Sequence, residues 1–77
     1  MDKSKIILVT GATRGIGLAL ANELARRGHT VYGAGRKPPG GGKALFTYVA
    51  MDLNDERSVK KAIDGIFKKN PRIDVLI

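Results

Sequence analysis

The chain has 77 residues, a formal net charge of +7 and no cysteine. This length allows at most one small domain, and the balance of 43% hydrophobic and 27% charged residues is typical of a globular chain. The lack of cysteine excludes disulfides, thiolate metal sites and thiol nucleophiles. There is no signal peptide and no apolar run long enough to span a bilayer, so we expect a cytoplasmic protein with no membrane partner.

The positive charge favours nucleic-acid binding as one class of function, because phosphates attract clustered basic residues. Here, however, the lysines and arginines are scattered along the chain, and the four aromatic residues fall in patterns typical of a core. No stacking platform for bases is evident. A basic nucleic-acid-binding domain is therefore the least favoured of our alternatives. Four of the lysines are expected to lie on a solvated face of a helix: Lys60, Lys61, Lys68 and Lys69.

Residues 5–9 predict a first strand whose unbroken apolar run after Lys5 indicates burial on both faces, as in a parallel sheet. A glycine-rich turn follows directly: Thr10-Gly11-Ala12-Thr13-Arg14-Gly15-Ile16-Gly17. We expect Gly11 to leave the strand with a positive φ, Gly15 to let a phosphate approach the main chain, and Gly17 to allow close helix packing. Free N–H groups at the start of the next helix predict an anion site for a dinucleotide pyrophosphate. An ordinary tight turn is the alternative.

A helix is predicted from this turn to Arg27. Gly28 is expected to end it in a left-handed conformation, and His29 is expected at the surface without a role. The predicted core-facing positions of the helix are Ile16, Ala19, Leu20, Leu24 and Ala25.

Residues 30–35 predict a second strand, and its end is where a dinucleotide fold meets the adenosine ribose. An acidic residue there would bind the ribose 2′-hydroxyl and repel a 2′-phosphate. This chain instead has Gly35 followed by Arg36 and Lys37, whose cations suit a 2′-phosphate. Arg14 is placed to approach the same phosphate. The pattern favours NADP over NAD as the cofactor, the alternative being that the two arginines are simply solvated.

The rest of the chain predicts a loop, a strand, a helix and a strand. Residues 37–43 contain two prolines and three glycines and predict a crossover without a helix. A third strand is expected over 44–51, a helix capped by Asn54 and ending before Pro71, and a fourth strand over 73–77. The expected apolar face of the second helix consists of Val59, Ala62, Ile63, Ile66 and Phe67.

This order of elements, β-α-β-β-α-β, predicts an α/β fold. We expect part of a Rossmann-like, doubly wound parallel sheet with strand order 3-2-1-4 and right-handed crossovers. The cofactor crevice would lie between strands 1 and 4, where the order reverses. Residues 73–77 would leave an apolar edge, so we expect a homo-oligomer or self-association through that strand.

The Thr-Gly-x-x-x-Gly-Ile-Gly pattern of residues 10–17 closely resembles the short-chain dehydrogenase/reductase family. The resemblance implies that residues 1–77 form the N-terminal part of a single dinucleotide-binding domain in an NADP-dependent oxidoreductase that interconverts a carbonyl and an alcohol. It also implies that Asp52, followed by Leu53, lies beside the adenine, although Asp52 serves equally well to support the next helix. The expected cofactor-binding residues are Gly11, Thr13, Arg14, Gly15, Ile16, Gly17, Arg36, Lys37, Asp52 and Leu53.

Two features depart from the family. A helix often occupies the connection at 37–43 in relatives, and the family's catalytic Ser and Tyr-x-x-x-Lys have no counterpart here, since neither Tyr32 nor Tyr48 has a lysine four residues later. We therefore expect no catalytic residue, no metal ligand and no activity from these residues alone. A small-molecule carbonyl or alcohol would bind only with the rest of the fold present. The alternative is a stand-alone nucleotide-binding module or folding fragment without chemistry.

Overall fold

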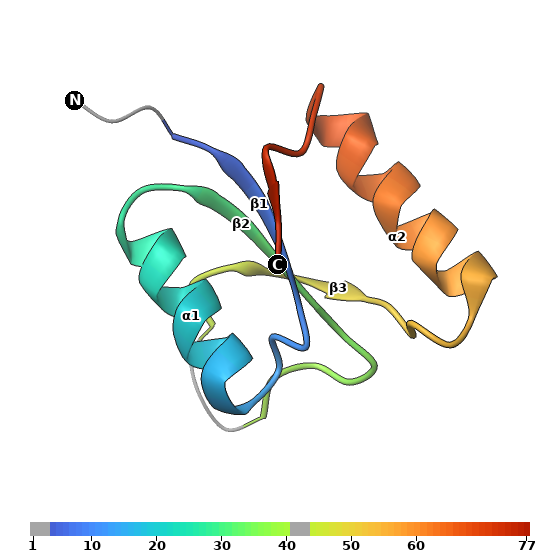
Figure 1. The fold of residues 1–77 in the computed structure, drawn as a ribbon, viewed down its shortest axis with the longest axis horizontal. Helices are drawn as coiled ribbons and strands as arrows, with labels where there is room; N and C mark the ends of the chain where they lie inside the picture. The colour runs from blue at the N-terminus through green and yellow to red at the C-terminus, as the bar shows by residue number, and fades with distance from the viewer. Residues whose placement is uncertain (1–3, 41–43) are drawn as a thin grey trace.

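A computed structural model describes residues 4–40 and 44–77; residues 41–43 of the predicted loop lie outside the described residues. The elements are, in order, β1 (Ile6–Thr10), α1 (Gly15–Arg26), β2 (Thr30–Gly35), β3 (Thr47–Ala50), α2 (Glu56–Lys69) and β4 (Val75–Leu76) (Figure 1). The four strands pair in parallel in the order β3-β2-β1-β4. The predicted α/β fold and strand order are confirmed.

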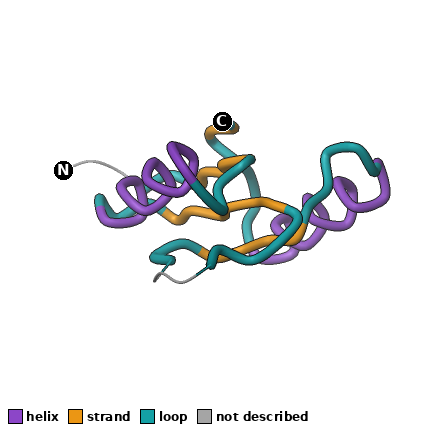
Figure 2. Tube along the Cα trace, turned by 90° about the horizontal axis from the view of Figure 1, so that it is seen from below, coloured by secondary structure: helices purple, strands orange, loops and turns teal. Residues whose placement is uncertain are grey.

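The two helices cover opposite faces of the sheet, which Figure 2 shows from the edge. Along β1, Ile7 and Val9 belong to the cluster under α1, while Leu8 belongs to the cluster under α2. Because successive strand side chains point to opposite faces, a strand between two helices must be apolar throughout. This explains the unbroken apolar run of β1, whose three central residues are at most 3% exposed.

The core-facing side of α1 differs in part from the prediction, because Leu24 and Ala25 pack on the sheet as expected but Ile16 and Ala19 do not. Ile16 is 89% exposed and Ala19 is exposed, whereas Ala21 is fully buried. The face that packs on the sheet consists of Ala21 with Leu18, Leu24 and Ala25. The apolar spacing fixes the period of a helix but leaves its rotation open, and the rotation is set here by Gly17, which faces the main chain of the turn.

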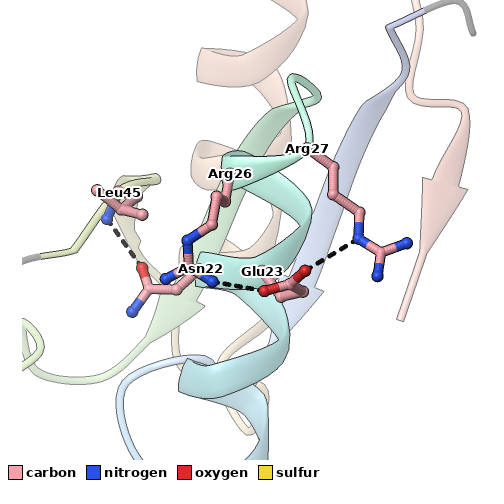
Figure 3. Close-up of polar contacts among 5 residues, drawn as sticks. All are labelled: Asn22, Glu23, Arg26, Arg27 and Leu45. Atoms are coloured by element: carbon pink, nitrogen blue, oxygen red, sulfur yellow. Dashed lines mark hydrogen bonds and ion pairs between the residues drawn. The ribbon is translucent and has the colours of Figure 1, made fainter.

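Phe46 lies against β2 on the α1 side of the sheet, after the short crossover between β2 and β3. Its ring is 7% exposed, and a Cβ on Gly33 would lie only 2.3 Å from Phe46 Cε1. Leu45 was expected in the third strand, but it is 54% exposed and precedes β3. Its N–H donates to Asn22 Oδ1 at 2.8 Å, which ties the crossover to α1 (Figure 3).

The carboxyl end of α1 is held by local polar contacts. The Glu23 carboxylate accepts hydrogen bonds from Arg27 and Arg26, and these contacts, chiefly the bond from Arg27, hold its pKa below the usual value (Figure 3). Gly28 has φ +97°, as expected for a left-handed helix end. The prediction of no role for His29 was wrong, because its Nδ1 accepts the N–H of Lys5 at 3.0 Å and so joins β1 to the turn before β2.

Helix α2 begins one residue later than predicted. Its cap is Asp55, whose Oδ1 accepts the N–H of Arg57 at 3.0 Å. Asn54, the predicted cap, is held in the preceding turn, where its N–H donates to Asp52 Oδ1 at 2.9 Å. The inner face is close to the prediction, except that Phe67 at its end is 46% exposed.

The fourth strand is shorter than predicted, yet hydrogen bonds to β1 continue on both sides of it. Asp74 donates its N–H to Ile6 O at 2.8 Å and accepts the N–H of Ile6 on Oδ2 at 2.9 Å. Arg72 Nε donates to the other carboxylate oxygen at 2.7 Å. The bond from Ile6, and then that from Arg72, lowers the pKa of Asp74. At the far end, Thr10 donates its N–H and its hydroxyl to Ile77 O.

Candidate functional site

The glycine-rich turn joins the end of β1 to the start of α1. Gly11 has φ +65°, as predicted, and Gly15 has φ +62° with open space where a side chain would begin. A Cβ on Gly17 would lie 2.0 Å from Gly11 O, so the helix packs directly on the turn. The N–H of Ala12 donates to Ala34 O at 3.1 Å and fixes the turn against β2.

The amino-terminal end of α1 presents hydrogen-bond donors. Arg14 occupies the cap position in an extended conformation without a side-chain cap hydrogen bond, and the first turn has no acidic residue. The start of α2, by contrast, is capped by Asp55 and followed by Glu56. The first N–H groups of a helix have no partner within it, and the dipole adds positive potential there. The amino-terminal end of α1 is therefore suited to binding an anion.

A cavity of about 320 Å³ opens beside this helix end. Three segments distant in sequence form it, namely the turn after β1, the end of β2 and the segment that leads into α2. It brings together six of the predicted cofactor-binding residues: Gly11, Thr13, Arg14, Arg36, Asp52 and Leu53. The arrangement follows from parallel pairing, because the carboxyl ends of parallel strands meet at one edge of the sheet.

A second hollow of about 580 Å³ extends the first, sharing Thr13, Arg14 and Arg36 with it. Lys37, Pro38 and Gly40 complete its lining. Three cations thus surround one hollow whose described lining contains no carboxylate. The electrostatics favour an anionic group, and a guanidinium can bind a phosphate through two parallel hydrogen bonds.

Asp52 both lines the cavity and supports the start of α2. Its Oδ1 accepts the N–H of Asn54, and its own N–H donates to Ser58 Oγ at 2.8 Å. The helix-support role foreseen from sequence is therefore present. Leu53, at 67% exposure, presents an apolar surface beside the cavity, where a flat ring could pack.

Three predicted residues, Gly15, Ile16 and Gly17, line neither hollow. Gly15 and Gly17 belong to the start of α1, and the side chain of Ile16 points to solvent. Sequence reasoning also missed several residues of the lining. Four of them lie at or beside the carboxyl end of a strand, which is the signal that could have found them: Thr10, Ala34, Gly35 and Met51. The fifth, Asn54, lies in the turn before the cap of α2.

The two tyrosines have structural hydrogen bonds. Tyr48 donates its hydroxyl to Gly35 O at 2.9 Å, and the hydroxyl of buried Tyr32 accepts from Asn70 Nδ2 at 2.7 Å. Within residues 4–40 and 44–77, no group of three or more His, Cys, Asp or Glu is arranged to hold a metal. In the same ranges, no helix is both long and apolar enough to cross a bilayer.

Comparison with known proteins gives a consistent result. The chain is 42% identical over 74 residues to a 3-ketodihydrosphingosine reductase of Bacteroides thetaiotaomicron, covering 95% of this chain and 27% of that protein. It is 37% identical over 82 residues to a 3-oxoacyl-(acyl-carrier-protein) reductase of Vibrio harveyi, covering 97% and 33%. The ligand-free structure of Thermoplasma acidophilum aldohexose dehydrogenase superposes with a TM-score of 0.84 and 35% identity, over 96% of this chain and 28% of that one.

The chain thus spans about a third or less of the length of each of these relatives. The sequence model of the short chain dehydrogenase family matches residues 5–77, which is nearly the whole chain. The chain therefore belongs to the short-chain dehydrogenase family.

Proposed function

We propose that this chain is the cofactor-binding segment of an NADP-dependent oxidoreductase that interconverts a carbonyl and an alcohol. Its family consists of oxidoreductases that bind a nicotinamide dinucleotide. Residues 1–77 would then be the N-terminal part of a single dinucleotide-binding domain whose catalytic half lies outside them. The observation that carries the proposal is the cavity at the uncapped start of α1, with cations on its outer side.

Each predicted residue has a role in this proposal. The main chain of Gly11, Gly15 and Gly17, with the first N–H groups of α1, would donate hydrogen bonds to the pyrophosphate, because the first N–H groups of a helix have no partner within it and lie at the positive end of its dipole. Thr13 and Ile16 would flank it on the turn. Beyond the ribose, Asp52 and Leu53 would contact the adenine, the carboxylate through the oxygen that Asn54 does not use.

Arg14, Arg36 and Lys37 support NADP over NAD. They surround the outer hollow, and no carboxylate follows β2 to bind a free 2′-hydroxyl. A hydrogen bond to a charged group contributes about 1.5–3 kcal/mol, which corresponds to roughly a 10- to 150-fold preference for the 2′-phosphorylated cofactor. Some of this preference would be lost as salt screens the exposed charges.

The test is an equilibrium titration of the full chain with NADP and with NAD. Arg36→Asp should remove the preference for NADP, because it places an anion where the 2′-phosphate would lie. Lys60→Asp makes the same change of charge on α2, away from both hollows, and should leave the preference intact. Equal affinity of the unaltered chain for the two cofactors would contradict the NADP assignment.

We also propose that these residues alone do not catalyse hydride transfer. Both tyrosine hydroxyls already have hydrogen-bond partners that serve the fold, and neither tyrosine is followed by a lysine at the family's spacing. NADPH oxidation with a panel of ketones and aldehydes measures this directly. Reproducible turnover would overturn the proposal, while binding without turnover also fits the alternative of a nucleotide-binding module without chemistry. If the complete gene product oxidised NADPH in the presence of a ketone or aldehyde, the oxidoreductase would be favoured over the module without chemistry.

Self-association through residues 73–77 is a further part of the proposal. Leu76 in β4 is 69% exposed, Ile77 directly after the strand is 48% exposed, and β4 is at the edge of the sheet. Unpaired apolar edges invite strand pairing. Sedimentation should therefore detect oligomers that Leu76→Lys reduces, and a monomer at all concentrations would refute this.

The cytoplasmic location stays a prediction, tested by cell fractionation.

A further inference from the structure

A groove of about 730 Å³ runs between β3 and α2. Its apolar floor includes Val49 from the strand and Ala62 and Ile66 from the helix. Gly65 lies in the second half of α2 and lines the same groove, and a Cβ built on it would meet no atom within 4 Å. A glycine inside a helix costs stability, and here the lack of a side chain leaves room in the groove.

Basic side chains line the same groove along the whole of α2. They are Arg57 in the first turn, Lys61 one turn later, and Lys68 and Lys69 in the last turn. At 1.5 Å per residue, Arg57 and Lys69 are about 18 Å apart along the helix axis. The described residues that line the groove include no Asp or Glu. The groove therefore combines an apolar floor with a row of positive charges.

The groove is separate from the candidate cofactor site, since the two have no lining residue in common. It lies at the β3 edge of the sheet. In a doubly wound sheet further strands are added beyond the fourth strand, at the opposite edge. The groove consequently faces away from the side on which the sheet of longer relatives would continue.

We propose that the β3–α2 groove binds an acidic amphipathic helix of a partner protein. Apolar side chains spaced three and four residues apart would enter the floor, and flanking carboxylates would meet the row of cations. The charge row matches about 12 residues of helix. A single anionic headgroup would engage only part of this row. Nucleic acid would leave the apolar floor unused, and the groove offers it no row of exposed aromatic rings: Tyr32 is 8% exposed, and Tyr48 is half-buried with its hydroxyl bound to Gly35 O.

The probe is a synthetic peptide of about 16 residues, with leucines along one face and glutamates beside them, together with a copy that has glutamine in place of every glutamate. Fluorescence anisotropy with the full chain should give at least about tenfold tighter binding of the glutamate peptide. The charge-reversing double variant Lys61→Glu/Lys68→Glu should lose that difference. Lys5→Glu/Lys60→Glu, which makes the same change of charge outside the groove, is the matched control and should retain the difference.

A second variant tests the floor independently of charge. Gly65→Leu should fill the groove and weaken binding of the glutamate peptide by at least about tenfold. Circular dichroism checks that α2 is intact in this variant. Equal binding of the two peptides, or unchanged binding in both variants, would overturn the proposal. So would tighter binding of duplex DNA or of phosphatidylglycerol vesicles than of the glutamate peptide, because those outcomes assign the charge row to a different class of partner.

Discussion

Replacing Gly17 with alanine tests how closely α1 packs on the glycine turn. The new methyl group would lie 2.0 Å from Gly11 O and 2.9 Å from Gly11 C, which are main-chain atoms in a turn held at φ +65°. Overpacking of this kind costs about 1–3 kcal/mol, and the upper end applies because a backbone oxygen has little freedom to move. The better helix propensity of alanine offsets about 1 kcal/mol. We expect a net loss of about 2 kcal/mol.

Gly65→Ala is the matched control for this change. It makes the same substitution inside a helix, at a position where the added Cβ meets open space. It should stabilise the chain by about 0.5–1 kcal/mol, so that the two variants differ by about 3 kcal/mol. Urea unfolding followed by circular dichroism measures both, and a thermal midpoint about 10 °C lower is expected for Gly17→Ala. If Gly17→Ala were as stable as Gly65→Ala, the close packing of helix on turn would be refuted.

Four further substitutions test local features of the fold. Asp55→Ala should cost about 1 kcal/mol through loss of the α2 cap, whereas Asn54→Ala should change urea stability by less than about 0.5 kcal/mol; the reverse order would contradict the observed cap. The lowered pKa of Asp74 means that its stabilisation is present above the ordinary value of about 3.9 and is lost as the pH falls further. Asp74→Asn should therefore flatten the decline of the urea midpoint below about pH 4, and an unchanged acid profile would exclude this linkage. Tyr32→Phe should lower the free energy of unfolding by about 0.5–1.5 kcal/mol, because it removes the hydrogen bond between the Tyr32 hydroxyl and Asn70. Unchanged thermal unfolding would show that this bond does not stabilise the fold.

The order of elements and the shape of the turn were predictable because they depend on local rules. An apolar run, three glycines and a helical repeat specify strand, turn and helix without any distant contact. The rotation of α1 was not predictable in this way. Its apolar spacing suits Ile16 as well as Leu18, and the choice depends on the contact between Gly17 and Gly11 O.

The remaining errors have a similar cause. Asn54 and Asp55 are equally good caps by residue type, and the turn that Asp52 organises decides between them. His29 accepts a bond from Lys5, 24 residues earlier, which no local pattern indicates. In the candidate site, the glycines and cations were predictable from their types, but the lining positions at strand ends became evident only from the sheet pairing.

The most direct test of the proposed cofactor site is an amide NMR titration of the isotope-labelled full chain with NADP. We expect the largest changes in amide chemical shift at residues 11–17, at Arg36 and Lys37, and at Asp52 and Leu53. Amides of α2 should change little, because that helix lies outside both hollows of the candidate site. Changes centred on α2, or none in the glycine turn at saturating NADP, would contradict the assignment of the turn as the dinucleotide site.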